Sequence, residues 1–287
     1  MVLEETYKLS NGLQIPKLAL GTWMIDDKDV GKAVKAAIDM GYRHIDTAQA
    51  YGNERGVGEA VRNAGIAREE LFVTTKLDAS HKNYEDAKAA IDGSLKTLGL
   101  DHIDLMLIHS PQPWGDFGGE DRYFEGNREA WKALEEAYND GKLRAIGVSN
   151  FEKADLDNLI DNASVKPMID QVLAHISNTP FDLIDYAKSK GLLVEAYSPV
   201  AHGKILDNAE IAAMADKYGV SVPQLSIRYC LELGLLPLPK TANPDHMRTN
   251  AAVDFSISEA DMETLKNIER IKDYGDASMF PVYGGKM

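Results

Sequence analysis

The chain has 287 residues, with 31 Lys and Arg against 45 Asp and Glu, which gives a formal net charge of -14. Apolar residues make up 44% and charged residues 26%, as in ordinary globular proteins and unlike disordered chains. A surface this negative repels phosphate backbones and anionic lipids, so we expect no nucleic-acid or membrane partner. Cys230 is the only cysteine and the N-terminus carries no apolar signal core, so we expect a cytoplasmic protein without disulfides.

The chain opens on a predicted β-hairpin at residues 7–18. Two short alternating runs flank Ser10, Asn11 and Gly12, and Asn-Gly favours the positive-φ turn that joins antiparallel strands. From residue 18 onwards the pattern changes. Short apolar runs end in polar residues, and each is followed by a stretch with the helical period of about 3.6 residues.

Eight such strand-then-helix units follow in order. The expected strands are residues 18–23, 43–48, 71–77, 102–110, 145–150, 168–174, 192–199 and 235–240. The expected helices are residues 30–41, 54–65, 84–99, 127–142, 152–163, 180–191, 208–219, 221–234, 244–255 and 258–271. Two helices therefore exceed the one that each strand needs, and the last helix begins with Ser258 as a predicted N-cap.

This alternation of strands and helices predicts an α/β fold. It requires parallel strand pairing, and continuous apolar runs suit strands that are buried on both faces. Eight regular units favour a closed (β/α)8 TIM barrel, with a doubly wound open sheet as the alternative. No linker rich in Pro, Gly or Ser divides the chain, so we expect residues 1–287 to form one domain.

Polar residues end the expected strands. A barrel of this kind carries its chemistry at the C-terminal ends of its strands. These ends hold Thr22, Trp23, Asp46, Lys76, His109, Ser149, Asn150, Gln171, Tyr197, Ser198 and Lys240. Taken singly, Lys76 fits a solvated side chain and His109 fits a core histidine. Their joint placement on successive strands is what predicts a functional site.

Three of these residues, together with Tyr51, suggest a particular chemistry. Asp46, Lys76 and His109 end the second, third and fourth strands, and Tyr51 follows in the loop after Asp46. An aspartate keeps a neighbouring lysine charged, and that cation favours phenolate, so we expect the pKa of Tyr51 to fall below about 10. Such a phenol can act as a general acid, while His109 donates a hydrogen bond to a substrate oxygen. The pattern predicts proton delivery to a carbonyl.

Motifs spread along the whole chain resemble those of the aldo-keto reductase superfamily. They are Asp46-Thr47-Ala48-x-x-Tyr51-Gly52-Asn53-Glu54, Lys76, Leu107-Ile108-His109, Ile146-Gly147-Val148-Ser149-Asn150-Phe151, Asp170-Gln171-Val172, Tyr197-Ser198-Pro199 and Leu238-Pro239-Lys240-Thr241. The bacterial branch that includes 2,5-diketo-D-gluconic acid reductases is the most similar. The resemblance implies a (β/α)8 barrel that reduces aldehydes and ketones, as small-molecule carbonyl substrates, with NADPH.

The resemblance also implies roles residue by residue. Tyr51 is expected to donate the proton, Lys76 to tune it, Asp46 to hold Lys76, and His109 to orient the carbonyl. Cofactor contacts are expected from Thr22, Asp46, Ser149, Asn150, Gln171, Tyr197, Ser198, Gly203, Leu206, Lys240, Thr241, His246 and Asn250. Substrate contacts are expected from Trp23, Tyr51, His109 and Trp114. Within the cofactor set, Tyr197 is expected to stack on the nicotinamide, and Lys240 and Thr241 to meet the 2′-phosphate.

One departure from the family pattern concerns the cofactor. The family usually has an Arg six residues after the Lys of its Pro-Lys-Ser/Thr motif, and this chain has His246 there. A neutral imidazole cannot make the charge-assisted contact of a guanidinium to a phosphate. We therefore expect a weakened preference for NADPH and some use of NADH, unless Arg248 reaches the phosphate instead.

The substrate end departs from the family pattern as well. The family often places Trp directly after the catalytic His, whereas here Ser110 follows His109 and Trp114 comes later in the loop. The C-terminal tail carries Met279, Phe280 and Tyr283. These three either close over the substrate mouth or belong to a mobile tail.

Two rival functions stay open. In an aldolase-type barrel, Lys76 would form a Schiff base, although a paired Asp46 argues against a neutral amine. A regulatory relative would bind cofactor without turnover, although the full set of Asp46, Tyr51, Lys76 and His109 argues against lost chemistry. No H-E-x-x-H spacing occurs among the seven His residues, so we expect no metal site. No heptad pattern indicates a partner helix, and we expect a monomer.

Overall fold

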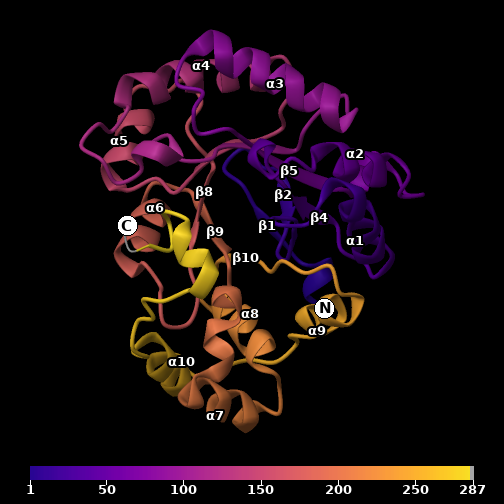
Figure 1. Ribbon diagram of the computed structural model, residues 1–287, viewed down its shortest axis with the longest axis vertical. Coiled ribbons are helices and arrows are strands. Elements are labelled where there is room, and N and C mark those ends of the chain that lie inside the picture. Colours follow the sequence, from indigo (N-terminus) through magenta and orange to yellow (C-terminus); the bar gives the residue numbers. More distant parts are fainter. Residues whose placement is uncertain (285–287) are drawn as a thin grey trace.

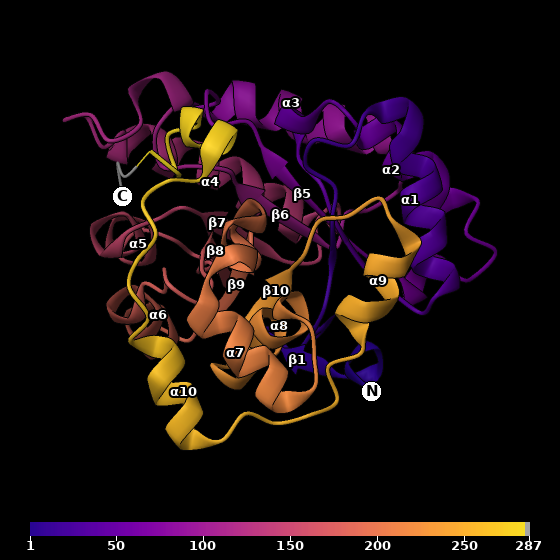
Figure 2. The same ribbon diagram turned by 60° about the horizontal axis from the view of Figure 1, so that its bottom comes forward.

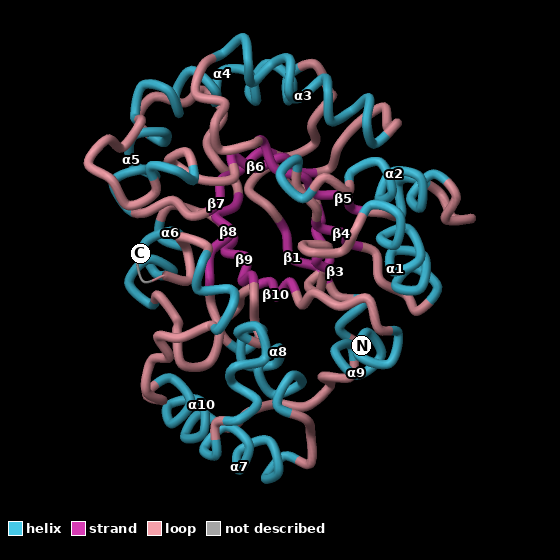
Figure 3. The backbone as a smooth tube through the Cα atoms, viewed as in Figure 1, coloured by secondary structure: helices cyan, strands magenta, loops and turns pink. Residues whose placement is uncertain are grey.

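The computed structural model describes residues 1–284, and its central feature is an eight-stranded parallel sheet. Its strands are β3 (Leu20–Gly21), β4 (His44–Asp46), β5 (Phe72–Leu77), β6 (Leu105–Ile108), β7 (Ile146–Ser149), β8 (Ile169–Leu173), β9 (Leu193–Tyr197) and β10 (Leu236–Leu238). A parallel bridge between Gly21 and Lys240 joins the two edge strands. The sheet thus closes into a ring inside the helices (Figure 3), which confirms the predicted (β/α)8 barrel.

Eight helices follow the strands and surround the barrel (Figures 1 and 2). They are α1 (Asp27–Asp39), α2 (Glu54–Arg62), α3 (Tyr84–Leu98), α4 (Phe124–Asn139), α5 (Lys153–Ile160), α6 (Phe181–Ser189), α8 (Val222–Glu232) and α9 (Pro244–Ala251). The two extra helices are α7 (Ala209–Tyr218) and α10 (Glu259–Lys266). The Ser258 hydroxyl accepts a hydrogen bond from the Asp261 amide, which confirms the predicted N-cap of α10.

The hydrophobic core lies between the strands and the helical ring. Every residue of β5 and β6 is buried, as a parallel strand covered on both faces requires. Helix α1 shows the complementary pattern, because Val30, Val34 and Ala37 recur at helical spacing and are all fully buried. The apolar periodicity of the sequence therefore maps onto the contact between helices and sheet.

The predicted hairpin is present at the N-terminus. Strands β1 (Thr6–Lys8) and β2 (Gln14–Pro16) pair antiparallel, and Tyr7 lies opposite Ile15. Gly12 adopts a φ of 89°, which L side chains rarely reach. The Tyr7 hydroxyl donates a hydrogen bond to the Leu235 carbonyl, just before β10 begins. The hairpin therefore covers the amino ends of the strands and leaves their carboxyl ends to the loops.

Three loop segments rise around the carboxyl ends of the strands. The first is residues 109–123, between β6 and α4; the Gln112 amide ties it together through hydrogen bonds to Gly118, Gly119 and Asp121. The second contains the 3₁₀ segment η5 (Ala201–Asp207), and the third is the tail with η6 (Gly275–Met279). Within residues 1–284, no helix has the length and apolar character needed to cross a bilayer.

Candidate active site

A cavity of about 780 Å³ opens at the carboxyl ends of the barrel strands. This volume suits a bound organic molecule. Every site residue predicted from the sequence except Lys76 lines it, namely Thr22, Trp23, Asp46, Tyr51, His109, Trp114, Ser149, Asn150, Gln171, Tyr197, Ser198, Gly203, Leu206, Lys240, Thr241, His246 and Asn250. Lys76 lies beneath the cavity floor with no exposed surface.

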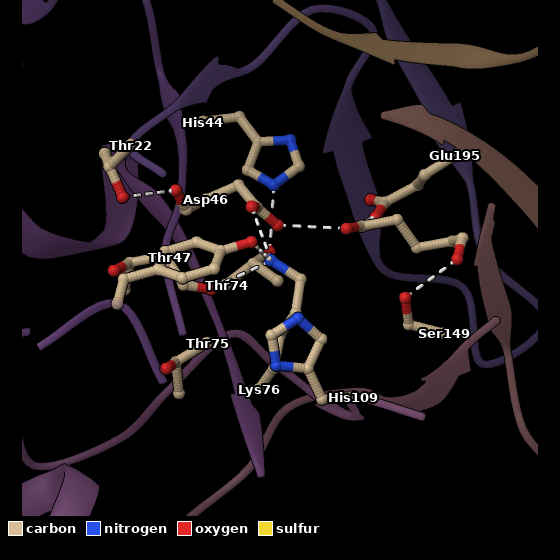
Figure 4. Close-up of polar contacts among 12 residues, drawn as sticks. Thr22, His44, Asp46, Thr47, Thr74, Thr75, Lys76, His109, Ser149 and Glu195 are labelled. Atoms are coloured by element: carbon tan, nitrogen blue, oxygen red, sulfur yellow. Dashed lines mark hydrogen bonds and ion pairs between the residues drawn. The ribbon is translucent and has the colours of Figure 1, made fainter. Parts of the chain in front are cut away.

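The Lys76 ammonium is the centre of a buried polar cluster (Figure 4). Its Nζ donates hydrogen bonds to Asp46 Oδ1 at 2.6 Å, to the Thr47 carbonyl at 3.0 Å and to the Tyr51 hydroxyl at 3.3 Å. Asp46 ends β4, Lys76 lies near the end of β5, and Tyr51 ends the short 3₁₀ segment η2 (Gln49–Tyr51). Neighbouring strands thus bring together three residues that the sequence separates.

The pKa values of this cluster follow from burial and charge. Burial by itself would lower the pKa of Lys76. The opposing effects of Asp46 and then Tyr51 together outweigh burial, so the pKa of Lys76 is raised and the amine stays an ammonium. Burial raises the pKa of Tyr51, and the attraction of Lys76 offsets only part of that rise. The prediction of a Tyr51 pKa below its usual value is therefore wrong, because desolvation of the phenolate outweighs the cation. Tyr51 is a protonated phenol at neutral pH.

The segment that carries Tyr51 is held on two sides. The Gln49 amide donates to the Ala90 carbonyl and the Ser94 hydroxyl of α3, and its oxygen accepts from the Asp78 amide after β5. Gly52 follows Tyr51 with a φ of 66°, which turns the chain into α2. These bonds restrict the position of the Tyr51 ring before any ligand arrives.

His109 follows β6 and lies beside the cluster. Its ring meets the Tyr51 ring edge-on at 5.7 Å and the Trp114 ring edge-on at 5.1 Å between centroids. Burial, and then the charge of Lys76, hold the pKa of His109 well below its usual value, so the imidazole is neutral. Its Nδ1 is buried without a hydrogen-bond partner in the described part of the chain. A neutral ring can offer one N–H to a ligand oxygen near the Tyr51 hydroxyl.

The cavity lining also includes the amide side chains of Asn150 and Gln171, whose orientations are set by hydrogen bonds. Asn150 donates to the His109 carbonyl and accepts from the Tyr197 hydroxyl at 2.7 Å. Gln171 uses its Nε2 for both Asp46 Oδ2 at 3.0 Å and Glu195 Oε2 at 2.7 Å. Because the Gln171 NH₂ group is engaged by two carboxyl groups, this side chain offers the cavity an acceptor oxygen.

The cavity wall that follows β10 carries the one lysine of the lining among residues 1–284. Lys240, Thr241, His246 and Asn250 line the cavity there. Arg248 does not line the cavity; its guanidinium pairs with Asp245 at 2.7 Å on the exposed surface. Lys240 is therefore the only Lys or Arg in the cavity lining of residues 1–284.

The C-terminal tail closes part of the cavity mouth. Phe280 packs edge-on against Trp23 at 5.0 Å, and the Tyr283 ring stacks with Trp23 at 6.1 Å. The Tyr283 hydroxyl shares a hydrogen bond of 2.7 Å with Ser198. Met279 is 80% exposed and does not line the cavity, so only two of the three predicted tail residues reach it.

Three residues of the site region do not follow from the sequence pattern. His202 lines the cavity edge-on to Trp23, and no strand-end pattern marks it. Lys82 donates to the Ser110 carbonyl at the base of the 109–123 loop. Glu195 lies fully buried under the floor, and the one signal that could have found it is a charged residue within the apolar run of β9.

The chain is thus a (β/α)8 protein whose cavity, at the carboxyl ends of the strands, lies over the hydrogen-bonded cluster of Asp46, Lys76 and Tyr51. A sequence model described as "Aldo/keto reductase family" matches residues 17–270. The chain belongs to this family and is an oxidoreductase.

Similar proteins match this chain over nearly its whole length. Glyoxal reductase of Bacillus subtilis (strain 168) is 41% identical over 283 residues, which cover 97% of this chain and 99% of that protein. The crystal structure of MGS-M4, an aldo-keto reductase from a Medee basin deep-sea metagenome library, superposes with a TM-score of 0.86 at 39% identity and covers 92% of this chain and 94% of the other. A Bombyx mori aldo-keto reductase in complex with NADP has a TM-score of 0.84 at 34% identity, covering 97% and 98%.

Proposed function

We propose that this protein reduces aldehydes and ketones to alcohols with NADPH, with Tyr51 as the proton donor. The observation that carries the proposal is the 3.3 Å contact between Lys76 Nζ and the Tyr51 hydroxyl, beside Asp46 at 2.6 Å. A phenol in this setting keeps its proton until negative charge develops on a neighbouring oxygen. The ammonium behind it then stabilises the phenolate that proton transfer leaves.

The residues have distinct parts in this reaction. Tyr51 and the neutral His109 bind the carbonyl oxygen from two sides, and Tyr51 passes its hydroxyl proton to that oxygen. The Lys76 ammonium, paired with Asp46, stabilises the negative charge that proton transfer leaves on the Tyr51 oxygen. The cofactor, when bound, supplies the hydride to the carbonyl carbon. Trp23 and Trp114 keep water away from the reacting centre, which strengthens the electrostatic contacts inside it.

The side chains that line the cavity are suited to bind a nicotinamide dinucleotide phosphate. Tyr197 offers an aromatic ring, and Gln171 offers an acceptor oxygen suited to the NH₂ of a carboxamide. Lys240 lies on the cavity wall that follows β10, where it would meet a 2′-phosphate. The relative from Bombyx mori was solved in complex with NADP. Because His246 replaces the usual Arg, we propose that NADH is also used.

Neutral carbonyl compounds suit the substrate end best. Trp23, Trp114 and Phe280 form an apolar wall, and the cavity lining of residues 1–284 has no lysine or arginine on that side of His109. A carboxylate or phosphate on the substrate would lack a charged partner there. Small neutral dicarbonyls are therefore favoured, in keeping with the glyoxal reductase activity named for the Bacillus subtilis relative.

The two rival functions make different demands on the same residues. A Schiff-base mechanism needs a neutral Lys76, whereas the net upward shift of its pKa keeps the amine protonated. A regulatory protein needs no proton donor, whereas the chain has Asp46, Tyr51, Lys76 and His109 together, and a measurement of turnover distinguishes the two functions. We therefore retain carbonyl reduction as the proposed function.

The test uses Tyr51→Phe, which removes only the hydroxyl. The variant should bind NADPH with an affinity close to that of the parent protein, while reduction of glyoxal falls by roughly 10²–10⁴-fold. Cofactor binding is followed by quenching of tryptophan fluorescence and turnover by absorbance of the reduced nicotinamide. Near-normal turnover in the variant would remove Tyr51 from the proposed role.

A further inference from the structure

The barrel interior contains a second buried carboxyl group that the reaction described above does not use. Glu195 lies on β9, two residues before Tyr197, and its side chain has no exposed surface. Its Oε2 accepts a hydrogen bond of 2.7 Å from Gln171 Nε2. Its Oε1 is buried without a partner in the described residues. Burying an ionised carboxylate costs free energy when one of its oxygens has no hydrogen-bond partner.

Gln171 joins this carboxyl to the centre of the site. The same Nε2 donates to Asp46 Oδ2 at 3.0 Å, and Asp46 Oδ1 accepts from Lys76 at 2.6 Å. A continuous line of hydrogen bonds therefore runs from Glu195 on β9 through Gln171, Asp46 and Lys76 to the Tyr51 hydroxyl. The carboxyl groups of Asp46 and Glu195 share the Gln171 amide. One ammonium, that of Lys76, faces both of them.

The charges around Glu195 decide its ionisation. The ionisable groups that face it are Asp46 on β4 and Lys76 on β5, with Tyr197 on its own strand. On β10 its register partner is the apolar Leu236, and on β8 it is Gln171. Because Lys76 already pairs with Asp46, a negative Glu195 would give the interior an excess negative charge. The neutral acid is therefore the favoured form in the free protein.

The cofactor changes this balance in one redox state only. The nicotinamide ring carries a positive charge when oxidised and none when reduced. Gln171 and Tyr197 line the cavity, and Glu195 lies directly behind the Gln171 amide. A cation placed on that floor would neutralise the second carboxylate, whereas a neutral ring would not.

We propose that Glu195 is a charge-compensating residue that gives up its carboxyl proton to solvent when NADP⁺ binds and keeps it when NADPH binds. This inference rests on the proposed function, because it requires the nicotinamide to lie on Gln171 and Tyr197. Its consequence is that the affinity for NADP⁺ rises with pH relative to that for NADPH. Acidic conditions therefore favour release of the oxidised cofactor after carbonyl reduction.

Burial and ordinary electrostatics place the change in an accessible pH range. Burial, and then the neighbouring Asp46 carboxylate, raise the pKa of Glu195 to about 8. Below that value the free protein holds the proton, and the bound cation lowers the pKa of the same carboxyl. The difference between the two cofactors is therefore expected to appear around neutral pH.

The test measures protons released on cofactor binding, by titration calorimetry in two buffers of different ionisation enthalpy. The variant is Glu195→Gln, whose amide oxygen can still accept from Gln171 and which mimics the protonated acid. The matched control is Glu54→Gln. Glu54 is also buried and its pKa is also raised, but its carboxyl group accepts a hydrogen bond from Thr75 and not from Gln171. Both cofactors carry the same phosphates, so comparing NADP⁺ with NADPH cancels proton uptake by those groups.

The expected result is proton release with NADP⁺ but not with NADPH in the parent and in E54Q, and no such difference in E195Q. The ratio of the two dissociation constants should change by roughly tenfold between about pH 6.5 and about pH 9 in the parent and stay flat in E195Q. Equal proton release by E195Q and the parent would overturn the inference, as would identical release with both cofactors. If neither dinucleotide bound at all, the proposed function itself would fail, which calorimetry distinguishes directly.

Discussion

Lys76 Nζ donates a hydrogen bond to the Tyr51 hydroxyl across 3.3 Å, from beneath a floor that leaves the lysine no exposed surface. This contact joins the proposed proton donor to the group proposed to stabilise its conjugate base, and the two come from different segments. The lysine comes from β5 and the tyrosine from the loop after β4. Burial keeps the phenol protonated, and the ammonium limits the cost of losing that proton.

Lys76→Met should slow carbonyl reduction by about a hundredfold or more, because the developing phenolate loses its ammonium. The variant also changes the pH profile. Reduction needs a protonated Tyr51, and its rate falls as pH rises through the Tyr51 pKa. Removing the ammonium raises that pKa further, so the alkaline limb of kcat/KM should move to higher pH. Lys35→Met, which breaks an exposed ion pair with Asp39, serves as the control. An unchanged rate would contradict the contact's role.

His246→Arg should increase the affinity for NADPH by roughly 10–100-fold and leave that for NADH nearly unchanged. A guanidinium adds a charge-assisted hydrogen bond to a phosphate, worth about 1.5–3 kcal/mol. The control is Arg248→Ala, since Arg248 pairs with Asp245 on the surface and should not alter the preference. Dissociation constants for both cofactors check this. A parent protein that prefers NADPH by roughly a thousandfold, about 4 kcal/mol, would refute the weakened preference.

The anchoring of the 109–123 loop gives a separate prediction for Lys82. Its Nζ donates to the Ser110 carbonyl and to Asn127 Oδ1, both at 2.8 Å. Lys82→Met removes both bonds and should raise KM for carbonyl substrates several-fold, with a smaller effect on kcat, because Trp114 lies on the loosened loop. Steady-state kinetics beside the exposed-site variant Lys88→Met measure this. Equal effects of the two substitutions would show that the anchor is dispensable.

Lys82 also makes stability depend on pH. Burial lowers the pKa of Lys82 to about 7. In the unfolded chain this lysine holds its proton up to about pH 10.4, so the unfolded state binds more protons between these values. The contribution of Lys82 to the free energy of unfolding is therefore complete above about pH 10.4 and is lost as pH falls to 7 and below. Thermal unfolding of the parent and of Lys82→Met at several pH values should show this difference, and parallel curves would disprove it.

Glu195 should produce the opposite slope. Its folded pKa of about 8 lies above the unfolded value of about 4.3, so the folded state retains a proton that the unfolded chain has lost between these two values. Stability from this group is complete below about pH 4.3 and declines as pH rises to 8, by at most about 1.4 kcal/mol per pH unit. The advantage of Glu195→Gln over the parent in chemical denaturation should grow over that range. A constant difference would show that Glu195 ionises normally.

Local sequence patterns predicted the order of the elements and the residues at the strand ends. The period of apolar residues reports which face of a segment is buried, and the eight repeated units imply a barrel whose carboxyl ends converge. Asp46, Lys76 and His109 could therefore be assigned to one site from their positions in the sequence. Ser258 and the Asn11-Gly12 turn were predictable for the same reason, since caps and turns depend on neighbouring residues.

Tertiary structure decided what depends on burial by distant segments. The direction of the Tyr51 pKa shift reversed because desolvation, which no local pattern reports, exceeds the attraction of Lys76. Arg248 turned to Asp245 rather than to the cavity, and Phe280 packed against Trp23 while Met279 remained exposed. Side-chain orientation and dielectric environment arise only when remote parts of the chain enclose the same space.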